Sequence, residues 1–260
     1  MSGAALERTA LRRDWAFVAA AFVLVLVAVA AGVAVVAERP AAARWAVPAG
    51  AVAAFELWFL RRHLGANHAE GHETRLYGTL GLANGLTLLR GGAFAAVAGF
   101  AAVAPSSELA WLPAVLYGGG CAVDWLDGFT ARRAGRTTVL GARLDMAFDT
   151  LGFLVAPVVG VLWGQLPVWY LSLSLARYLF RAGRGLRRRR GKPVFDLPPS
   201  RVRRPLAGVQ MVFITLALAP VLSAGTVRLL AAVVLVPSLA VFARDYLAVA
   251  GGFRGRKGND

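Results

Sequence analysis

Cysteine is almost absent from this chain of 260 residues, which has a single cysteine, Cys121. One cysteine cannot form an internal disulfide, so oxidative cross-linking takes no part in holding the fold together. Acidic residues are also scarce, with 14 Asp and Glu against 29 Lys and Arg, and the formal net charge is +15. Such an excess occurs in nucleic-acid-binding proteins and on the inner faces of membrane proteins, so the positions of the charges must separate these classes.

Long polar stretches are few, because apolar runs dominate the chain. Hydrophobic residues make up 58% of it, above the roughly 45–50% of soluble domains. Runs of about 17–25 apolar residues match the thickness of a bilayer, and they must be helical because lipid offers no partner to an exposed backbone. We therefore predict an all-α integral membrane protein of about eight spans, near residues 15–37, 45–60, 83–104, 108–127, 142–164, 167–183, 205–223 and 227–249.

The basic residues fall on one side of this predicted topology. With the N-terminus inside and the spans alternating, only Arg39, Arg44 and Arg228 lie on or beside outer loops. The other 26 of the 29 basic residues lie on or near the cytoplasmic side, as the positive-inside rule predicts. The charge therefore needs no nucleic-acid partner, and we expect a multi-pass protein of the cell membrane with both termini in the cytoplasm.

Two polar segments divide the chain. The stretch 63–78 separates two spans from the other six, and residues 73–82 are predicted to form a short interfacial helix. We expect an N-terminal hairpin and linker over 1–72, a core over 73–250 and a basic tail over 251–260. His68 and His72 have the spacing of some zinc ligands, but neighbouring glycines favour a loop and no HExxH pattern accompanies them. The second polar segment, 185–204, contains three prolines and is predicted to be a loop.

Four aspartates lie where the fourth predicted span ends and the fifth begins: Asp124, Asp127, Asp145 and Asp149. Spacings of three and four residues place each pair on one face of a helix, and two helices joined by a short turn can direct all four carboxylates into one space. Carboxylates so close together repel one another unless cations neutralise them. Hard oxygen ligands in this number suit Mg²⁺ or Mn²⁺, which leave positions open for phosphate oxygens, so a pyrophosphate is the substrate that fits.

Small residues accompany the aspartates. Gly128 and Ala131 continue the Asp124 face, and Gly141 lies one turn before Asp145. They either leave room for a nucleotide or let two helices approach closely.

The segment is also open to three other interpretations. The aspartates could form a structural salt-bridge cluster with neighbouring arginines, or an ion pathway in a small transporter. A transporter needs its carboxylates near the midplane, whereas these lie at the ends of spans. A membrane prenyltransferase also binds pyrophosphate through magnesium, but its acidic motifs resemble NDxxD and lack the DGxxAR found here.

The segment resembles the signature of the CDP-alcohol phosphotransferases, D-x2-D-G-x2-A-R-x8-G-x3-D-x3-D. The resemblance covers about residues 74–250, the six-span core, and leaves the first two spans without assigned chemistry. Every fixed position of the signature is matched, by Asp124, Asp127, Gly128, Ala131, Arg132, Gly141, Asp145 and Asp149.

The resemblance implies transfer of the phosphate of a CDP-activated lipid, with a diacyl or an archaeal ether tail, to a small alcohol with release of CMP. It implies a two-ion Mg²⁺ or Mn²⁺ site on the four aspartates, Asp149 as general base, contact with membrane lipids and a homodimer. The residues implied to border the CDP group are Asn84, Thr87, Gly128, Ala131, Arg132, Thr138 and Gly141.

The acceptor alcohol is expected to carry a phosphate, as glycerol 3-phosphate or an inositol phosphate does. Ser200 to Arg203 resembles the Ser-x-x-Lys stretch of phosphate-accepting members, with arginine in place of lysine. Arginine keeps the charge and offers a fork of donors to phosphate. The same arginines could instead be ordinary membrane anchors. The residues expected at the acceptor are Ser200, Arg203, Arg204, Arg177 and Arg244.

Overall fold

The computed structural model describes residues 3–37, 39–72, 75–134, 138–197 and 199–251, with the backbone alone for 3–5 and 124–134. Within these ranges the structure is helical and contains no strand, so the predicted all-α class is confirmed. The α-helices are α1 Gly3–Ala37, α2 Arg39–His63, α3 Gly81–Gly99, α4 Leu112–Ala134, α5 Val139–Leu162, α6 Ser172–Arg189, α7 Arg203–Leu218 and α8 Ala224–Val249. Short 3₁₀ turns are η1 Leu64–Ala66, η2 Phe100–Ala102 and η3 Val168–Leu171.

Each predicted span overlaps one of these helices. Four segments of the described chain are long and apolar enough to cross a membrane, Leu6–Ala37, Gly81–Ala102, Val139–Leu162 and Ala224–Val249. The remaining helices are shorter or more polar, since α6 ends in three arginines and α7 has 16 residues. The helices support a multi-pass membrane protein, and the number of crossings, eight, stays a prediction.

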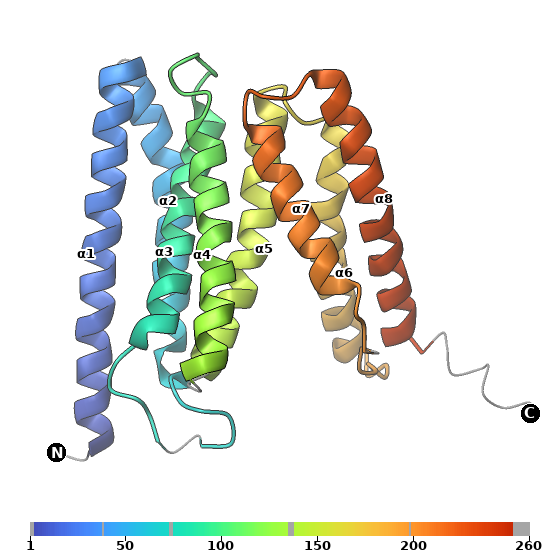
Figure 1. Cartoon of the computed structure of the whole chain (residues 1–260). Helices are drawn as coiled ribbons and strands as arrows, with labels where there is room; N and C mark the ends of the chain where they lie inside the picture. The colour runs from blue at the N-terminus through green and yellow to red at the C-terminus, as the bar shows by residue number, and fades with distance from the viewer. Residues whose placement is uncertain (1–2, 38, 73–74, 135–137, 198, 252–260) are drawn as a thin grey trace, which may run out of the picture.

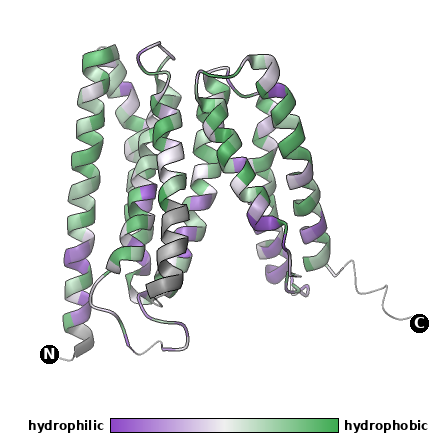
Figure 2. Cartoon of the chain, viewed as in Figure 1, coloured by the Kyte–Doolittle hydropathy of each residue, from purple (hydrophilic) through white to green (hydrophobic). Residues whose placement is uncertain are grey.

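The helices form two groups that separate toward one end of the bundle (Figure 1). The α1–α2 hairpin packs on α3, and α3 also contacts α4 and α5. On the other side α7 packs on α4, α5 and α8, while α6 packs on α5 and α8. The start of α1, the end of α8, the α2–α3 linker and the α6–α7 loop all lie at the end where the groups separate. Hydrophilic residues gather toward the same end (Figure 2), in agreement with the common side predicted for these segments.

The linker between α2 and α3 differs from the prediction. Residues 75–80 are irregular, so the interfacial helix expected over 73–82 is wrong there, and residues 73 and 74 lie outside the described ranges. The Asn67 side chain donates to the carbonyls of Tyr77 (3.0 Å) and Thr79 (2.8 Å), which a helix would use for its own bonds. Gly81 then adopts φ +76°, a left-handed conformation that separates the linker from α3.

The loop between α6 and α7 is shorter than predicted. The segment 185–204 was expected to be a loop, but α6 continues to Arg189 and the loop begins after it. Gly191, at φ +64°, ends the helix, with its N–H on the Arg188 carbonyl and the Lys192 N–H on the Arg187 carbonyl. This pair of bonds is the Schellman arrangement. The stop signal is therefore the glycine, and the prolines act only further along the loop.

Two glycines of α3 let α2 approach closely. A Cβ added at Gly99 would overlap the fully buried Trp45 indole of α2. A Cβ at Gly91 would lie 2.6 Å from the Phe148 ring of α5 and 3.0 Å from the Glu56 carboxylate of α2. The N-terminal hairpin is thus fitted to α3 at two places along its length.

We predict that Gly99→Ala lowers the stability of the protein by about 1–3 kcal/mol, because the rigid Trp45 ring cannot move aside in a packed interior. The measurement is thermal unfolding of the purified protein in detergent. Gly119→Ala in α4 is the control, since a Cβ there meets nothing within 4 Å and alanine favours a helix over glycine. Equal melting temperatures for Gly99→Ala and the wild type would contradict the tight fit.

Candidate active site

The four aspartates lie on two consecutive helices, as predicted. Asp124 and Asp127 belong to the last part of α4, and Asp145 and Asp149 to the first part of α5. The two helices contact each other, and α4 ends at Ala134 while α5 begins at Val139. The predicted residues of α4 whose side chains lie outside the described part are Asp124, Asp127, Gly128, Ala131 and Arg132.

Asp145 and Asp149 share one buried cation, Arg90 of α3. One guanidinium nitrogen of Arg90 lies 2.7 Å from Asp145 Oδ1, and the other lies 3.2 Å from Asp149 Oδ1. The Arg90 side chain is 1% exposed, while those of Asp145 and Asp149 are 51% and 28% exposed. A buried arginine therefore holds both carboxylates from the protein interior, while the exposed parts of the two aspartates remain open to a ligand.

Arg90 was missing from the sequence prediction. The signal was present, because an arginine inside an apolar run is costly and needs a partner. Arg90 also follows Thr87 by three residues and Asn84 by six, so the three residues lie along one side of α3.

Asn84 and Gly141 make a close contact between α3 and α5. The Asn84 amide nitrogen donates to the Leu80 carbonyl at 2.8 Å, to Asn67 at 3.3 Å and to the Thr138 hydroxyl at 3.4 Å. A Cβ at Gly141 would lie 2.7 Å from Asn84 Oδ1. Of the two reasons considered for a small residue at Gly141, close approach of helices is the one seen here.

Thr138 is the N-cap of α5. Its hydroxyl oxygen accepts the Gly141 N–H at 2.9 Å, which satisfies a backbone donor that the helix itself leaves unpaired. The N–H of Val139, the first residue of α5, donates to the backbone carbonyl of His68 in the linker at 3.0 Å. The start of α5, one and two turns before the aspartates of the site, is therefore held by its own cap and by the linker.

The remaining residues expected near the CDP group and the acceptor have separate surroundings. Thr87 is buried and donates to the Ala83 carbonyl at 3.2 Å. The Arg177 guanidinium of α6 stacks 3.9 Å from the centre of the Phe153 ring of α5. Arg181, one turn later, donates to the Met146 carbonyl at 3.1 Å, beside Asp145. Two arginines of α6 thus flank the aspartate-bearing part of α5.

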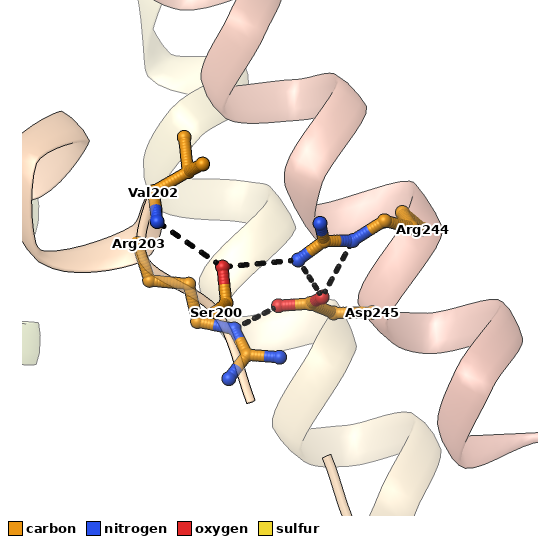
Figure 3. Close-up of polar contacts among 5 residues, drawn as sticks. All are labelled: Ser200, Val202, Arg203, Arg244 and Asp245. Atoms are coloured by element: carbon orange, nitrogen blue, oxygen red, sulfur yellow. Dashed lines mark hydrogen bonds and ion pairs between the residues drawn. The ribbon is translucent and has the colours of Figure 1, made fainter. Parts of the chain in front are cut away.

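A second polar cluster joins the start of α7 to the end of α8 (Figure 3). Arg203 Nε lies 2.5 Å from one oxygen of Asp245, and Arg244 Nη2 lies 2.8 Å from the other. Arg244 also donates to the Ser200 hydroxyl at 3.3 Å. The structure therefore brings together Ser200, Arg203 and Arg244 of the predicted acceptor residues, while Arg204 is exposed and Arg177 packs on Phe153.

Asp245 organises this cluster and was not predicted. Its side chain is 7% exposed, against 30% for Arg203 and 42% for Arg244. The sequence feature that could have indicated Asp245 is its position as a lone carboxylate in the last apolar run. Because one carboxylate fixes two guanidinium groups, the arginines are held in place with a net positive charge between them.

The described carboxylates are chemically suited to a divalent metal ion. Asp145 and Asp149 offer hard oxygen ligands one turn apart and already attract a shared cation, Arg90. Among the side chains that the structure describes, no group of three or more His, Cys, Asp and Glu could hold a metal. The predicted set of four depends on Asp124 and Asp127, whose side chains lie outside that part.

Comparison with known proteins gives two findings. A family model described as "CDP-alcohol phosphatidyltransferase" matches residues 80–241, which run from the start of α3 into α8. Proteins named "Putative cardiolipin synthase" from Mycobacterium bovis (strain ATCC BAA-935 / AF2122/97) and Mycobacterium tuberculosis (strain ATCC 25618 / H37Rv) are each 38% identical over 73 residues. This match spans 28% of the chain and 34% of each relative, about a third of their length. No solved structure matches.

Proposed function

Because the chain belongs to the CDP-alcohol phosphatidyltransferase family, we propose that it transfers the phosphate of a CDP-activated lipid to a small alcohol and releases CMP. The observation that carries this proposal is the pairing of Asp145 and Asp149 on buried Arg90, within a segment that has every fixed residue of the family signature. The ion pairs of Arg90 are also what the rival interpretation, a structural salt-bridge cluster, requires. An experiment must therefore separate the catalytic interpretation from the structural one.

Asp124, Asp127, Asp145 and Asp149 are the residues that would hold two Mg²⁺ or Mn²⁺ ions. Such ions neutralise the charge of a pyrophosphate and improve CMP as a leaving group. Asn84, Thr138 and Gly141 would act around the CDP group chiefly by fixing the spacing of α3 and α5, as their contacts indicate. Thr87, which is bonded within α3, would border the CDP group from that helix. Gly128, Ala131 and Arg132 of α4 complete the proposed CDP-binding set.

Asp149 is the proposed general base. Arg90 holds this carboxylate in position, while 28% of the side chain stays exposed. Asp149 would take the proton of the acceptor hydroxyl as that oxygen attacks the lipid-linked phosphorus. The new oxygen–phosphorus bond forms while the bond to CMP breaks, and the proton remains on Asp149 until it passes to solvent.

The proposed acceptor carries a phosphate group. Arg203 and Arg244 share one carboxylate, so the cluster has one positive charge more than Asp245 neutralises. Arg203 and Arg244 are also partly exposed, and guanidinium groups suit phosphate oxygens. Glycerol 3-phosphate and inositol phosphates fit this description. Phosphatidylglycerol is a second phosphate-bearing candidate, suggested by the relatives named for cardiolipin, a lipid built of two phosphatidyl groups on glycerol.

We place the protein in the cell membrane with the active site toward the cytoplasm. Hydrophilic residues gather at the end of the bundle where α1 begins and α8 ends (Figure 2). The segments at that end are rich in Arg and Lys, and such segments stay in the cytoplasm under the positive-inside rule. The homodimer expected from the resemblance stays a prediction.

The orientation predicts opposite labelling of two loops. In a Cys121→Ala background, we expect a membrane-impermeant thiol reagent added to intact cells to label Ser107→Cys, between α3 and α4. Lys192→Cys, in the α6–α7 loop, should react only after the membrane is opened. The reverse pattern would show that the protein has the opposite orientation.

Replacing the proposed base should stop catalysis without unfolding the protein. We expect Asp149→Asn to lower CMP release at least a thousandfold, because an amide cannot accept the proton and is a weaker metal ligand. The assay follows CMP release from CDP-diacylglycerol with a panel of phosphorylated and neutral alcohols, and Gly119→Ala is the control. Near-normal release by a folded Asp149→Asn protein would leave the salt-bridge cluster as the better interpretation.

Replacing an acceptor arginine should affect one substrate only. We expect Arg203→Ala to raise the KM for the phosphorylated acceptor about tenfold, or 1.4 kcal/mol, with the KM for the CDP-lipid unchanged. The exposed Arg201, two residues earlier, is the matched control when changed to alanine. Equal effects of Arg203→Ala and Arg201→Ala would assign these arginines to anchoring at the membrane surface.

A further inference from the structure

A buried acid of the N-terminal hairpin lies behind the active-site arginine. Glu56 of α2 is 0% exposed, and within the described part of the chain neither of its carboxylate oxygens has a hydrogen-bond partner. Burial of a carboxyl group without such partners is costly. Glu56 also lies outside residues 80–241, the part that the family model matches, so the signature assigns it no role.

The surroundings of Glu56 connect it to the site. Its Oε1 lies against the backbone of Gly91, where an added Cβ would be 3.0 Å away, and Gly91 directly follows Arg90. Phe148, which directly precedes Asp149, closes the same space, since its ring would be 2.6 Å from that Cβ. Burial is the largest influence on this carboxyl, and the charge of Arg90 opposes it. Glu56 therefore lies within the interior that Arg90 occupies, on the hairpin side of α3.

We propose that Glu56 is a positioning residue for Arg90, an anionic partner within the protein interior that takes up its charge when Asp145 and Asp149 bind divalent cations. This inference rests on the proposed function, because it assumes that those two carboxylates hold metal ions.

The physical reason is competition for the same oxygens. Arg90 contacts both aspartates. A metal cation bound to these two carboxylates would displace the guanidinium and also repel it. Arg90 is 1% exposed, so it cannot shift its charge into water and needs an anion inside the protein. Glu56 is an acid in that interior, and among the described residues its carboxylate has no hydrogen bond to give up. By attracting Arg90 away from the aspartates, it makes them better ligands.

Glutamine separates this role from a structural one. Gln matches a protonated glutamic acid in size and keeps its packing, but it cannot attract a guanidinium as an anion does. If Glu56 only fills space between α2 and α3, Glu56→Gln will behave as the wild type. If its charge matters, Arg90 in Glu56→Gln stays on Asp145 and Asp149, and metal binding weakens.

The experiment is titration of the purified full-length protein with Mn²⁺, with free Mn²⁺ followed by electron paramagnetic resonance. We expect Glu56→Gln to raise the Kd for Mn²⁺ about tenfold, or 1.4 kcal/mol. Glu70→Gln, which removes the same charge from the exposed linker, is the matched control and should bind as the wild type. In an Arg90→Gln background, where no guanidinium competes, Glu56→Gln should have no further effect on the Kd.

Glu56→Asp decides the question if the glutamine variant does not fold. Aspartate keeps the negative charge but is one methylene shorter, which moves the carboxylate away from Arg90. We therefore expect the Kd for Mn²⁺ to rise about threefold. An unchanged Kd in folded Glu56→Gln, or in Glu56→Asp where that variant must be used, would overturn the proposal. The same loss with and without Arg90 would also overturn it, because Glu56 would then act on the site by a route that does not involve Arg90.

The proposed metal site is tested by the same titration. If the wild type does not bind Mn²⁺, or Asp149→Asn binds it as tightly as the wild type, the metal site and the role of Glu56 both fail. If Asp149→Asn weakens binding and Glu56→Gln does not, only the role of Glu56 fails.

Discussion

The ion pairs of Arg90 with Asp145 and Asp149 tie α3 to α5 at the point where the chemistry is proposed to occur. A guanidinium that is 1% exposed is strongly destabilised without anions beside it in the protein interior, so the two helices must keep their register. The glycines serve this requirement. Gly141 admits Asn84 between the same two helices, and Gly91, which directly follows Arg90, leaves room for Phe148 of α5 and Glu56 of α2. The small residues act mainly by setting distances between charged helices.

The helices and the aspartate pairs could be predicted because each depends on local sequence. Long apolar runs must be helical in lipid, and spacings of three and four residues fix a face of a helix wherever the helix is placed. The boundaries that failed depend on contacts between distant segments. The linker before α3 is irregular because Asn67 binds the carbonyls of Tyr77 and Thr79, and no local preference reports such a contact.

The partners of the predicted residues could not be found from spacing. Arg90, Glu56 and Asp245 are each an ionisable side chain within an apolar helix. The sequence shows that burying them costs free energy, but it does not show which residues they contact. Arg90 lies 55 positions from Asp145, and Asp245 lies 42 from Arg203. Such pairs depend on which helices pack together. A lone charge in an apolar run is thus the useful signal, and its meaning comes from the fold.

The two polar clusters use the same chemistry with opposite excess charge. At the aspartates, the ion pairs between described side chains join two carboxylates to one guanidinium, and this excess of carboxylate groups favours cations. At Asp245, two guanidinium groups share one carboxylate and leave one positive charge in excess, which favours an anion. In each cluster the single ion that pairs with two others is the more buried one, with Arg90 1% exposed and Asp245 7% exposed. Its two partners of opposite charge are more exposed. The buried ion fixes the geometry, and the outward ions determine the sign of the ligand. The proposed substrates match this division, because the donor would be held through its pyrophosphate by metal ions and the acceptor by its phosphate.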